Sequence, residues 1–412
     1  MDDISSKTDI ENSTASEDPD ETLVDRVVSI DVYRGMVMFL MLAEVMHLYD
    51  LAESFPGHSW LEWLRFHTTH MVWEGCSLHD LIQPGFTFLV GVAMPFSIAS
   101  RLKRGKSTGR LVAHAALRSF ILIALGIVLR SLGRDQTYFT FEDTLTQIGL
   151  GYFVVFCIAV WAPPKGYLIA LGMVLAGFWG TYAISQPPPD DFDYPAVGVP
   201  ENWEHHEPGF ASRFNKNSNI SWRFDTWFLN LFPREEPFRF NAGGYATLSF
   251  VPTMATMLFG LIAGTWIRVV QTFRGRFLRM VLFGTTCIVV GMLLSKTDIC
   301  PLVKRIWTPS FALYSGGCCL IWLACLHAIC DRAKFRKWAS PFVVIGANSI
   351  LIYVMSWTVA GPIRAMLFRH FGERPFAIFG EALVPVTAGA ATLLVMYGVL
   401  WWCYRRRIFI KI

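Results

Sequence analysis

Five side chains that can take up or release a proton lie within nineteen residues, in the segment FHTTHMVWEGCSLHDLIQP (66–84). They are His67, His70, Glu74, His79 and Asp80. A histidine titrates near pH 6.5 and is the usual general base for an amine or hydroxyl nucleophile. It can also carry an acyl group as a covalent intermediate. The segment therefore indicates either the entrance of an active site or a hydrated loop that is rich in polar side chains.

A carboxylate beside the catalytic histidine would fix its tautomer and stabilise its charged form. We expect Asp80 to be that carboxylate, because an apolar run begins beside it, whereas Glu74 is expected to lie nearer water. A contact between His70 and Asp80 would be tertiary, and the structural alternative is an interfacial histidine with a buried helix N-cap. Three histidines with this spacing match no known metal-ligand pattern, so no metal is predicted.

The composition indicates a polytopic membrane protein. Hydrophobic residues make up 53% of the 412 residues and charged residues 17%, below the roughly 25% typical of soluble domains. The apolar runs are long and continuous, which favours helices over the short alternating segments of a β-barrel. The formal net charge of +4 is not gathered on one soluble face, so no nucleic-acid partner is predicted.

About 20 apolar residues are needed for a helix to cross a hydrocarbon core of roughly 30 Å. The sequence predicts an all-α fold with about ten such spans. They are 35–52, 79–100, 111–131, 144–162, 166–186, 246–268, 277–295, 309–330, 341–361 and 380–403. The second span carries Asp80, Gln83 and Pro84, so it must be surrounded by other helices rather than by lipid.

Basic residues cluster on one side of the predicted bundle. They lie in the loop 101–110, around 268–276, in 331–338 and after the last span. Cytoplasmic loops carry an excess of Lys and Arg. Both termini are therefore predicted to be cytoplasmic.

Two segments outside the spans differ in composition. Residues 1–25 hold nine carboxylates and one lysine, which predicts an acidic disordered cytoplasmic tail ahead of a single transmembrane domain, 26–412. The extracytoplasmic loop at about 187–245 is long and rich in Trp, His, Asn, Asp and Arg. Aromatic faces with amides and carboxylates suit a saccharide, although an aromatic belt at the membrane interface has the same composition. The candidate saccharide contacts are Trp203, Asn217, Trp222 and Asp225.

Three more charged residues stand in or beside predicted spans. Glu44 lies within the first span, where an ionisable group indicates either a function, such as substrate binding, or a structural hydrogen bond. Arg34 and Arg118 lie toward the cytoplasmic side. Arginine suits bidentate phosphate contacts, and the alternative is that both side chains reach the interface as snorkelling cations.

Seven segments occur in an order and spacing that resemble one known family. They read SIDVYRGMVMFLM, HMVWEGCSLHDLIQPGFTFLVGVAMPFS, LRSFIL, LTQIGLGYF, KRIWTPSFALYSGG, GANSILIYV and RRRIFIKI. Together, over 26–412, they resemble the transmembrane acyltransferase part of the heparan-α-glucosaminide N-acetyltransferase family, and more closely a bacterial branch of it. No single segment would suffice, because the specificity lies in the set.

The resemblance implies an enzyme that moves the acetyl group of cytosolic acetyl-CoA across the membrane to a sugar amine. The family's active-site histidine, in H-x-x-W-x-G ahead of D-L-x-x-P, matches His70, with Asp80 following. The arginine of R-S-F matches Arg118, and the N-S-I segment matches Asn348 and Ser349. On this basis the residues predicted to contact acetyl-CoA are Arg34, Arg118, Gln147, Asn348 and Ser349, with Glu44 and Glu74 near the acceptor.

The sequence also departs from the lysosomal enzyme of that family. Glu44 and Val45 stand near an asparagine of the lysosomal enzyme, Ser356 stands in place of a histidine, and the long loop differs. We therefore expect the acceptor to be an amine or hydroxyl of an extracytoplasmic (amino)sugar in a bacterial cytoplasmic membrane, with acceptor identity and acyl length left open. Whether His70 is a base or an acyl acceptor, and whether the chain forms a homodimer, stay open too. A transporter or flippase of a small polar or saccharide substrate is the alternative function.

Overall fold

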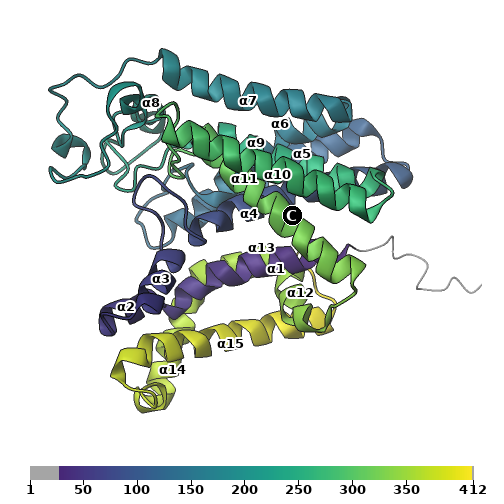
Figure 1. Ribbon diagram of the computed structural model, residues 1–412. Coiled ribbons are helices and arrows are strands. Elements are labelled where there is room, and N and C mark those ends of the chain that lie inside the picture. The colour runs from purple at the N-terminus through teal and green to yellow at the C-terminus, as the bar shows by residue number, and fades with distance from the viewer. Residues whose placement is uncertain (1–26, 411–412) are drawn as a thin grey trace, which may run out of the picture.

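The computed structural model describes residues 27–410 as helices joined by loops (Figure 1). The predicted acidic tail, 1–25, lies outside the described residues. The α-helices are α1 Val28–Ala43, α2 Asp50–Ser54, α3 Ser59–Thr68, α4 Ile82–Lys103, α5 Thr108–Ser131, α6 Thr144–Trp161, α7 Pro164–Ile184, α8 Ile220–Phe228, α9 Phe250–Val269, α10 Phe273–Lys296, α11 Pro309–Leu326, α12 Ser340–Ala347, α13 Ser349–Thr358, α14 Ala360–Phe371 and α15 Val384–Arg405. Within residues 27–410, the β-structure is an isolated bridge between Glu74 and Val303.

Eight helices in the described part of the chain are long and apolar enough to cross a membrane, and they coincide with eight of the ten predicted spans. The predicted span 341–361 is instead a pair, α12 and α13, bent by 69°. Counting that pair as one span gives nine. The predicted span 35–52 is placed differently, because α1 begins at Val28 and gives way at Glu44 to a short 3₁₀ turn that ends at left-handed His47. An all-α polytopic fold is confirmed, and the count of ten is not.

The helices form two groups. In Figure 1 the helices α4 to α11 make the upper group, and α1 lies with α12 to α15 in the lower group. Within the upper group α4 packs on α9, α5 on α6, and α10 on α11. In the lower group α1 packs on α12, and α14 on α15. Contacts of α1 with α4 and α11 join the two groups.

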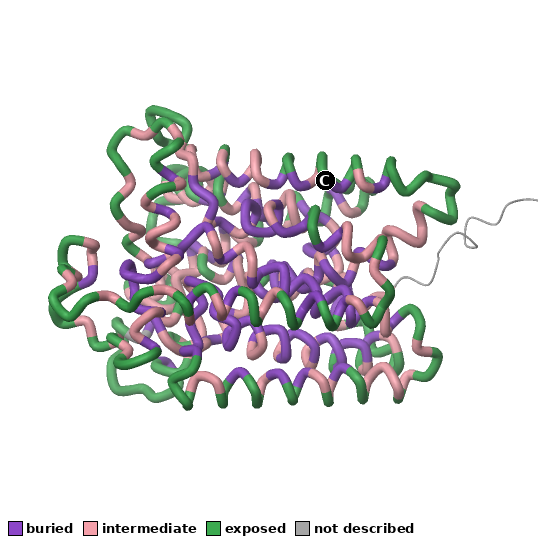
Figure 2. Tube along the Cα trace, turned by 90° about the horizontal axis from the view of Figure 1, so that it is seen from above, coloured by how far each residue is buried: buried purple, intermediate pink, exposed green. Residues whose placement is uncertain are grey.

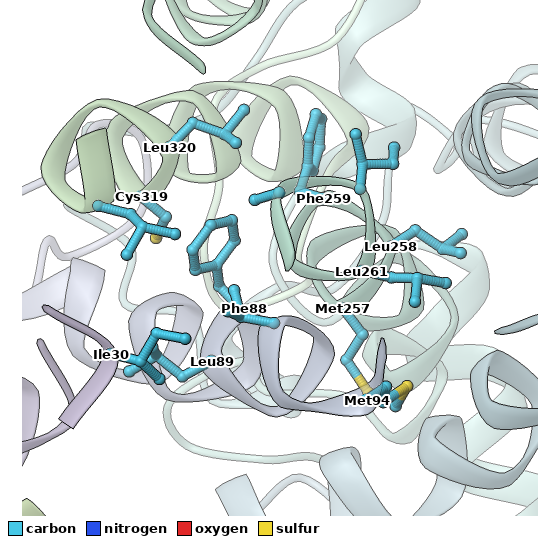
Figure 3. Packing of buried hydrophobic residues seen from close by; sticks show 14 of the residues in the cluster. Ile30, Phe88, Leu89, Met94, Met257, Leu258, Phe259, Leu261, Cys319 and Leu320 are labelled. Carbon is cyan, nitrogen blue, oxygen red and sulfur yellow. The ribbon is translucent and has the colours of Figure 1, made fainter. Parts of the chain in front are cut away.

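Helix α9 lies at the centre of the upper group and is buried along most of its length. Figure 3 shows its side chains Met257, Leu258, Phe259 and Leu261 beside Phe88 and Leu89 of α4. Gly260 of α9 and Gly91 of α4 each face the main chain of the other helix, where an added methyl group would overlap a carbonyl oxygen. Small residues thus allow the close backbone approach that is typical of membrane helices.

The outward faces of the bundle are apolar and exposed. Figure 2 shows buried residues on the inner sides of the helices and exposed ones along their outer sides. On α5 the exposed side chains include Leu117, Phe120 and Val128, and on α10 they include Leu282 and Leu293. A belt of large apolar side chains without a protein partner is expected where lipid surrounds the protein.

The long loop, 187–245, is folded on itself at one end of the bundle, around α8 (Figure 1). The side-chain amide of Asn217 donates to the carbonyl oxygens of Val197 and Asn241, both at 2.9 Å. The Trp222 indole donates to the carbonyl oxygen of Arg239 at 2.9 Å. The loop is therefore a packed cap with a fixed position on the bundle.

Candidate active site

The turn that precedes α4 wraps around the carboxylate of Asp80, which is fully buried. Its Oδ2 accepts hydrogen bonds from the main-chain N–H groups of Met71 and Ser77, at 3.1 and 3.0 Å, and from Ser77 Oγ at 3.1 Å. All three donors belong to the loop before the helix. Asp80 thus organises this loop and does not act as the N-cap of α4, which was the structural alternative.

His70 meets Asp80 as the sequence predicts. Its Nδ1 lies 2.8 Å from Asp80 Oδ1, and its side chain is 37% exposed. Burial lowers the pKa of His70, and Lys304 lowers it further, while the hydrogen bond to Asp80 raises it; the net shift is downward. His70 is therefore mainly neutral at pH 7. The ring of His79 lies 4.4 Å from that of His70, centre to centre.

Lys304 completes the cluster and was missed by the sequence analysis. Its Nζ lies 3.3 Å from Asp80 Oδ1, 2.9 Å from His70 Nδ1 and 3.4 Å from His70 Nε2, and its side chain is only 6% exposed. The missed signal was a lysine in a loop predicted to be extracytoplasmic, where the positive-inside rule disfavours Lys and Arg. A buried cation in such a loop needs a carboxylate partner, and Asp80 supplies it.

The three groups together fix the tautomer of His70. A ring nitrogen has either one hydrogen or one lone pair, so Nδ1 can serve only one of its two close neighbours. The Asp80 carboxylate can only accept, so Nδ1–H is donated to Asp80. The similar distances from Lys304 Nζ to the two ring nitrogens place the ammonium alongside the ring. Nε2 is left with its lone pair.

A cavity of about 480 Å³ opens beside this cluster, between the two groups of helices. We call it the His70 cavity. Glu44 lies in its wall, together with His79 and Lys304. The remaining lining residues are Val37, Met38, Met41, Val45, His47, His70, Ile82, Gln83, Phe86, Thr144, Tyr353, Ser356 and Trp357. The cavity is therefore mostly apolar, with a few polar groups converging at one end, which is typical of small-molecule sites.

A second cavity, of about 290 Å³, lies further along α4, and Phe86 lines both cavities. We call it the arginine cavity, because Arg34, Arg101 and Arg118 line it together with Ser349. Arg118 donates to Tyr152 Oη at 3.2 Å and lies over that ring. Three guanidinium groups in one cavity can bind an anion such as phosphate.

The bend between α12 and α13 lies where the two cavities meet. Gly346 and Ser349, next to the bend, line the arginine cavity, while Tyr353 and Trp357 of α13 line the His70 cavity. The bend residue Asn348 is buried. One broken helix thus contributes to both cavities.

Two predicted acetyl-CoA contacts are engaged elsewhere. Asn348 donates from Nδ2 to the carbonyl oxygen of Ile408 at 3.0 Å. Gln147 donates to the carbonyl oxygens of Phe141, at 2.6 Å, and Thr247, at 3.1 Å. Neither side chain is among the described residues that line the two cavities. Both polar side chains serve to satisfy main-chain groups.

The predicted saccharide contacts in the long loop are also apart from His70. Asn217 and Trp222 are bonded within the loop, as described above. The Lys216 ammonium lies over the indole of Trp203, with Nζ 4.6 Å from the ring centre. Asp225 accepts from the N–H of Thr247 at 2.9 Å, and burial raises the pKa of its carboxyl to about 7.

Glu74, the carboxylate expected nearer water, is held in place as well. It accepts a hydrogen bond from Ser295 Oγ and pairs through its main chain with Val303. None of these five predicted contacts is among the described residues that line the His70 cavity. Local hydrogen bonds hold four of the five side chains, and a cation–π contact with Lys216 holds Trp203.

A groove made of two parts shares the lining residue Trp357 with the His70 cavity. One part, of about 490 Å³, is lined by Trp357 with Arg130, Glu142 and Asn241. The other part, of about 590 Å³, includes Arg234 and Arg239. Both parts share Arg134, Tyr138, Phe238 and Phe240. We call this hollow the Arg134 groove, and its guanidinium groups lie against aromatic faces, with Arg134 3.8 Å from the ring centre of Tyr138.

These features define an all-α polytopic membrane protein in which a partly exposed His70 meets a buried Asp–Lys pair beside a cavity between two groups of helices. Within residues 27–410, no group of three or more His, Cys, Asp or Glu side chains is arranged to hold a metal ion. The chemistry that the cluster offers is proton transfer or nucleophilic attack by a neutral imidazole, next to a fixed cation.

Comparison with known proteins gives two relatives, and no protein-family profile matches the chain. Heparan-alpha-glucosaminide N-acetyltransferase of Homo sapiens is 23% identical over 376 residues, which are 81% of this chain and 53% of that protein. The Mus musculus protein of the same name is 28% identical over 138 residues, 32% of this chain and 19% of that protein. The chain thus spans about half the length of the human relative, and the resemblance seen in the sequence is confirmed as a distant one.

Proposed function

We propose that this protein is a transmembrane acetyltransferase. It moves an acetyl group from cytosolic acetyl-CoA to an amine or hydroxyl of an extracytoplasmic (amino)sugar. The observation that carries the proposal is that the His70 cavity, beside the His70 cluster, and the arginine cavity are neighbours that share the lining residue Phe86. The names of the two distant relatives support the same reaction class.

The donor end of the proposed enzyme is the arginine cavity. CoA carries phosphates, which cannot enter hydrocarbon without a cost of several kcal/mol for each charge. Arg34, Arg101 and Arg118 offer guanidinium groups that would hold those phosphates at the end of α4 where the basic loop 101–110 follows. The uncharged arm of CoA would then pass Phe86 and bring the thioester to His70. In this proposed orientation Val28, the first residue of α1, and Arg405, the last residue of α15, would lie on the cytoplasmic side of a bacterial membrane.

The chemical step uses the free Nε2 of His70. In one route Nε2 takes the proton of the acceptor amine or hydroxyl, whose N or O atom forms a bond to the thioester carbon. In the other, Nε2 itself attacks that carbon, and the acetyl group passes from the ring to the acceptor. In both routes the C–S bond breaks and the electron pair leaves with sulfur. In the first route the proton that Nε2 took from the acceptor passes to the CoA sulfur; in the second the CoA thiolate leaves first and takes a proton from water, and the acceptor releases its own proton to water when it takes the acetyl group from the ring. Asp80 holds the ring and stabilises it when it becomes positively charged.

The acceptor would arrive along the Arg134 groove rather than through the predicted contacts in the long loop. The groove shares Trp357 with the His70 cavity, and a sugar ring would contact the aromatic surface that the stacked arginines leave uncovered. Its arginines offer hydrogen-bond donors to hydroxyl or anionic groups. In this proposal the sugar would enter beside Trp357, and the donor would enter beside Phe86.

The bent helix favours a second candidate function, a transporter or flippase. Broken helices between two access routes are typical of secondary transporters. A carrier would need neither a neutral histidine with a lone pair at the cavity wall nor an arginine-lined cavity suited to phosphates. The acetyl-CoA requirement therefore separates the two functions.

The test is acetyl transfer from radiolabelled acetyl-CoA by the purified full-length protein in detergent, with glucosamine and short aminosugar chains as acceptors. His70→Ala should abolish transfer and leave acetyl-CoA binding, measured by calorimetry, unchanged. His58→Ala is the matched control, because His58 is exposed at the start of α3. Absence of acetyl-CoA binding by the folded wild-type protein would overturn the proposal and favour the transporter.

A further inference from the structure

Lys304 is held rigidly in the wall of the His70 cavity. It lies in the loop between α10 and α11, and this loop is joined to the His70 loop by the bridge between Glu74 and Val303 and by a hydrogen bond from the N–H of Gly75 to the carbonyl oxygen of Leu302, at 2.8 Å. The carbonyl oxygen of Lys304 accepts from the N–H of Trp307 at 2.9 Å. These main-chain contacts fix the backbone of Lys304 next to the His70 loop, and the contacts of its ammonium with Asp80 and His70 hold the buried side chain.

Burial is the main cause that favours a neutral His70, and among the charged groups of the cluster Lys304 acts in the same direction, whereas Asp80 favours the protonated form. Asp80 and Lys304 form a buried pair of opposite charge, so a proton on His70 would leave an additional positive charge close to Lys304. Two other groups face His70. The carboxylate of Glu44 favours protonation of His70, and His79 is a second imidazole at the same cavity wall. The buried ammonium of Lys304, 2.9 Å from Nδ1, opposes protonation of His70, against the Asp80 carboxylate at 2.8 Å, which favours it.

The groups around Lys304 itself are few. Arg305 opposes its charge from the next position in the chain, while Asp80 and Cys76 favour it. Burial lowers the pKa of Lys304, and the contact with Asp80 raises it. The carboxylate of Asp80, at 3.3 Å, therefore offsets part of the effect of burial and favours the ammonium form.

The ammonium also lies within reach of the reacting nitrogen. Its 3.4 Å distance to Nε2 places it beside the atom at which the thioester carbon becomes tetrahedral. An ammonium has three N–H donors, and Asp80 Oδ1 takes one. The others can donate to an oxygen in the cavity, where preorganised donors act on developing charge with little reorganisation.

Resting on the proposed function, we propose that Lys304 is a third catalytic residue, which keeps His70 neutral before the reaction and stabilises the oxyanion during it. When the acceptor or Nε2 bonds to the carbonyl carbon, the C=O π electrons move to oxygen, and the Lys304 ammonium donates to that oxygen. When the C=O bond forms again, the C–S bond breaks and the electron pair leaves with sulfur. Lys304 keeps its protons throughout, so the overall balance of the transfer is unchanged.

A purely structural role for Lys304 would be to neutralise Asp80. The double variant Lys304→Met with Asp80→Asn separates the two roles, because it removes both charges and leaves no buried ion unpaired. If Lys304 acts on the transition state, this double variant transfers acetyl groups about 100-fold more slowly than Asp80→Asn alone. Folding of each variant is checked by size-exclusion chromatography and thermal unfolding.

The second readout does not depend on acetyl transfer. Diethyl pyrocarbonate modifies neutral imidazoles, so the pH midpoint of its reaction with His70, followed by mass spectrometry of the His70 peptide, reports the protonation of that residue. In Lys304→Met the midpoint should move to higher pH, because a nearby positive charge is lost. The exposed His58 is the internal control and should not move.

The two readouts distinguish failure of this inference from failure of the proposed function. An unchanged His70 midpoint in Lys304→Met, with a double variant as active as Asp80→Asn, would overturn the role of Lys304 while acetyl transfer by the wild type stands. If the His70 midpoint shifts in Lys304→Met but the wild type transfers no acetyl group, the coupling between Lys304 and His70 is supported and the acetyltransferase is rejected.

Discussion

Asn348 and Ile410 are joined by a hydrogen bond from the main-chain N–H of Ile410 to Asn348 Oδ1, at 3.0 Å. Asn348 also donates to the carbonyl oxygen of Ile408, so one amide side chain holds the segment that follows α15. Ile410 in turn lines the arginine cavity. The bend between α12 and α13 and the far end of the described chain are thus coupled at the proposed donor site.

Asn348→Leu is predicted to weaken this coupling. Because the variant leaves the main-chain groups of Ile408 and Ile410 without partners, unfolding should become easier by about 1–3 kcal/mol. The apparent KM for acetyl-CoA should rise, since a wall of the arginine cavity is released. Thermal unfolding in detergent and donor saturation curves measure the two effects, with Asn230→Leu in the long loop as the control. An unchanged KM would show that the segment does not shape the donor site.

Asp80 and His70 should differ sharply in their effects on stability. Asp80→Ala leaves the buried Lys304 ammonium without its carboxylate and is predicted to destabilise the fold by about 3–5 kcal/mol. His70→Ala leaves the Asp80–Lys304 pair intact, and its side chain is partly exposed, so the melting temperature should change little. Both variants should lose transfer. Equal stability of the two variants would contradict the charge pairing described here.

Transfer should depend on pH through His70. Because the pKa of His70 is lowered from its ordinary value of about 6.5, the neutral reactive form is present at pH 7 and is lost only as the pH falls below that value. The acid limb of kcat/KM should therefore lie below pH 6.5. A limb above this value would contradict a depressed pKa.

The same shift has a defined consequence for stability. A histidine with a lowered pKa in the folded state binds fewer protons when folded than when unfolded. Its contribution to stability is therefore full above about pH 6.5 and is lost as the pH falls toward the folded value. Wild type should lose more stability on acidification than His70→Ala, which thermal unfolding at a series of pH values measures.

The sequence was sufficient for features that repeat or that are local. Long apolar runs predicted eight of the spans, because burial in lipid needs continuous hydrophobicity. The bend at Asn348 was not foreseen, since α12 and α13 read as one apolar run and the break is sustained by hydrogen bonds to Ile408 and Ile410, about sixty residues away. The beginning of α1 was also missed, because its first turn is polar.

The candidate site likewise contains residues that the sequence could indicate and one that it could not. The residue types of His70 and Asp80 and the resemblance to a known family made them candidates for a pair, but their contact is tertiary and only the structure shows it. Lys304 is 234 residues from His70, and its role arises only from packing. The loop residues Trp203 and Trp222 had the composition of a sugar site, but composition does not tell which aromatic side chains line a cavity and which pack on their own loop.

The arginine cavity gives a prediction for donor affinity. Arg118→Ala removes a guanidinium from the cavity and should raise the KM for acetyl-CoA about tenfold or more, with a smaller change in kcat, because a charge-assisted contact contributes about 1.5–3 kcal/mol. Arg118→Lys should be intermediate, since lysine cannot make a bidentate contact. Arg110→Ala, exposed in the first turn of α5, is the control. A KM unchanged in Arg118→Ala would place the phosphates elsewhere.

Phe86 gives the sharpest test of the path between the two cavities. Phe86→Trp adds volume at the residue that both cavities share, while leaving the arginines and the His70 cluster in place. Transfer from acetyl-CoA should fall about tenfold or more, because misplacing the thioester by about 1 Å can cost 100-fold in rate. Calorimetric affinity for CoA should be retained, and so should the pH midpoint of His70 modification. Phe153→Trp, on the exposed face of α6, is the matched control. If transfer by Phe86→Trp equals that of the wild type, the thioester does not reach His70 past Phe86, and the donor must enter by another route.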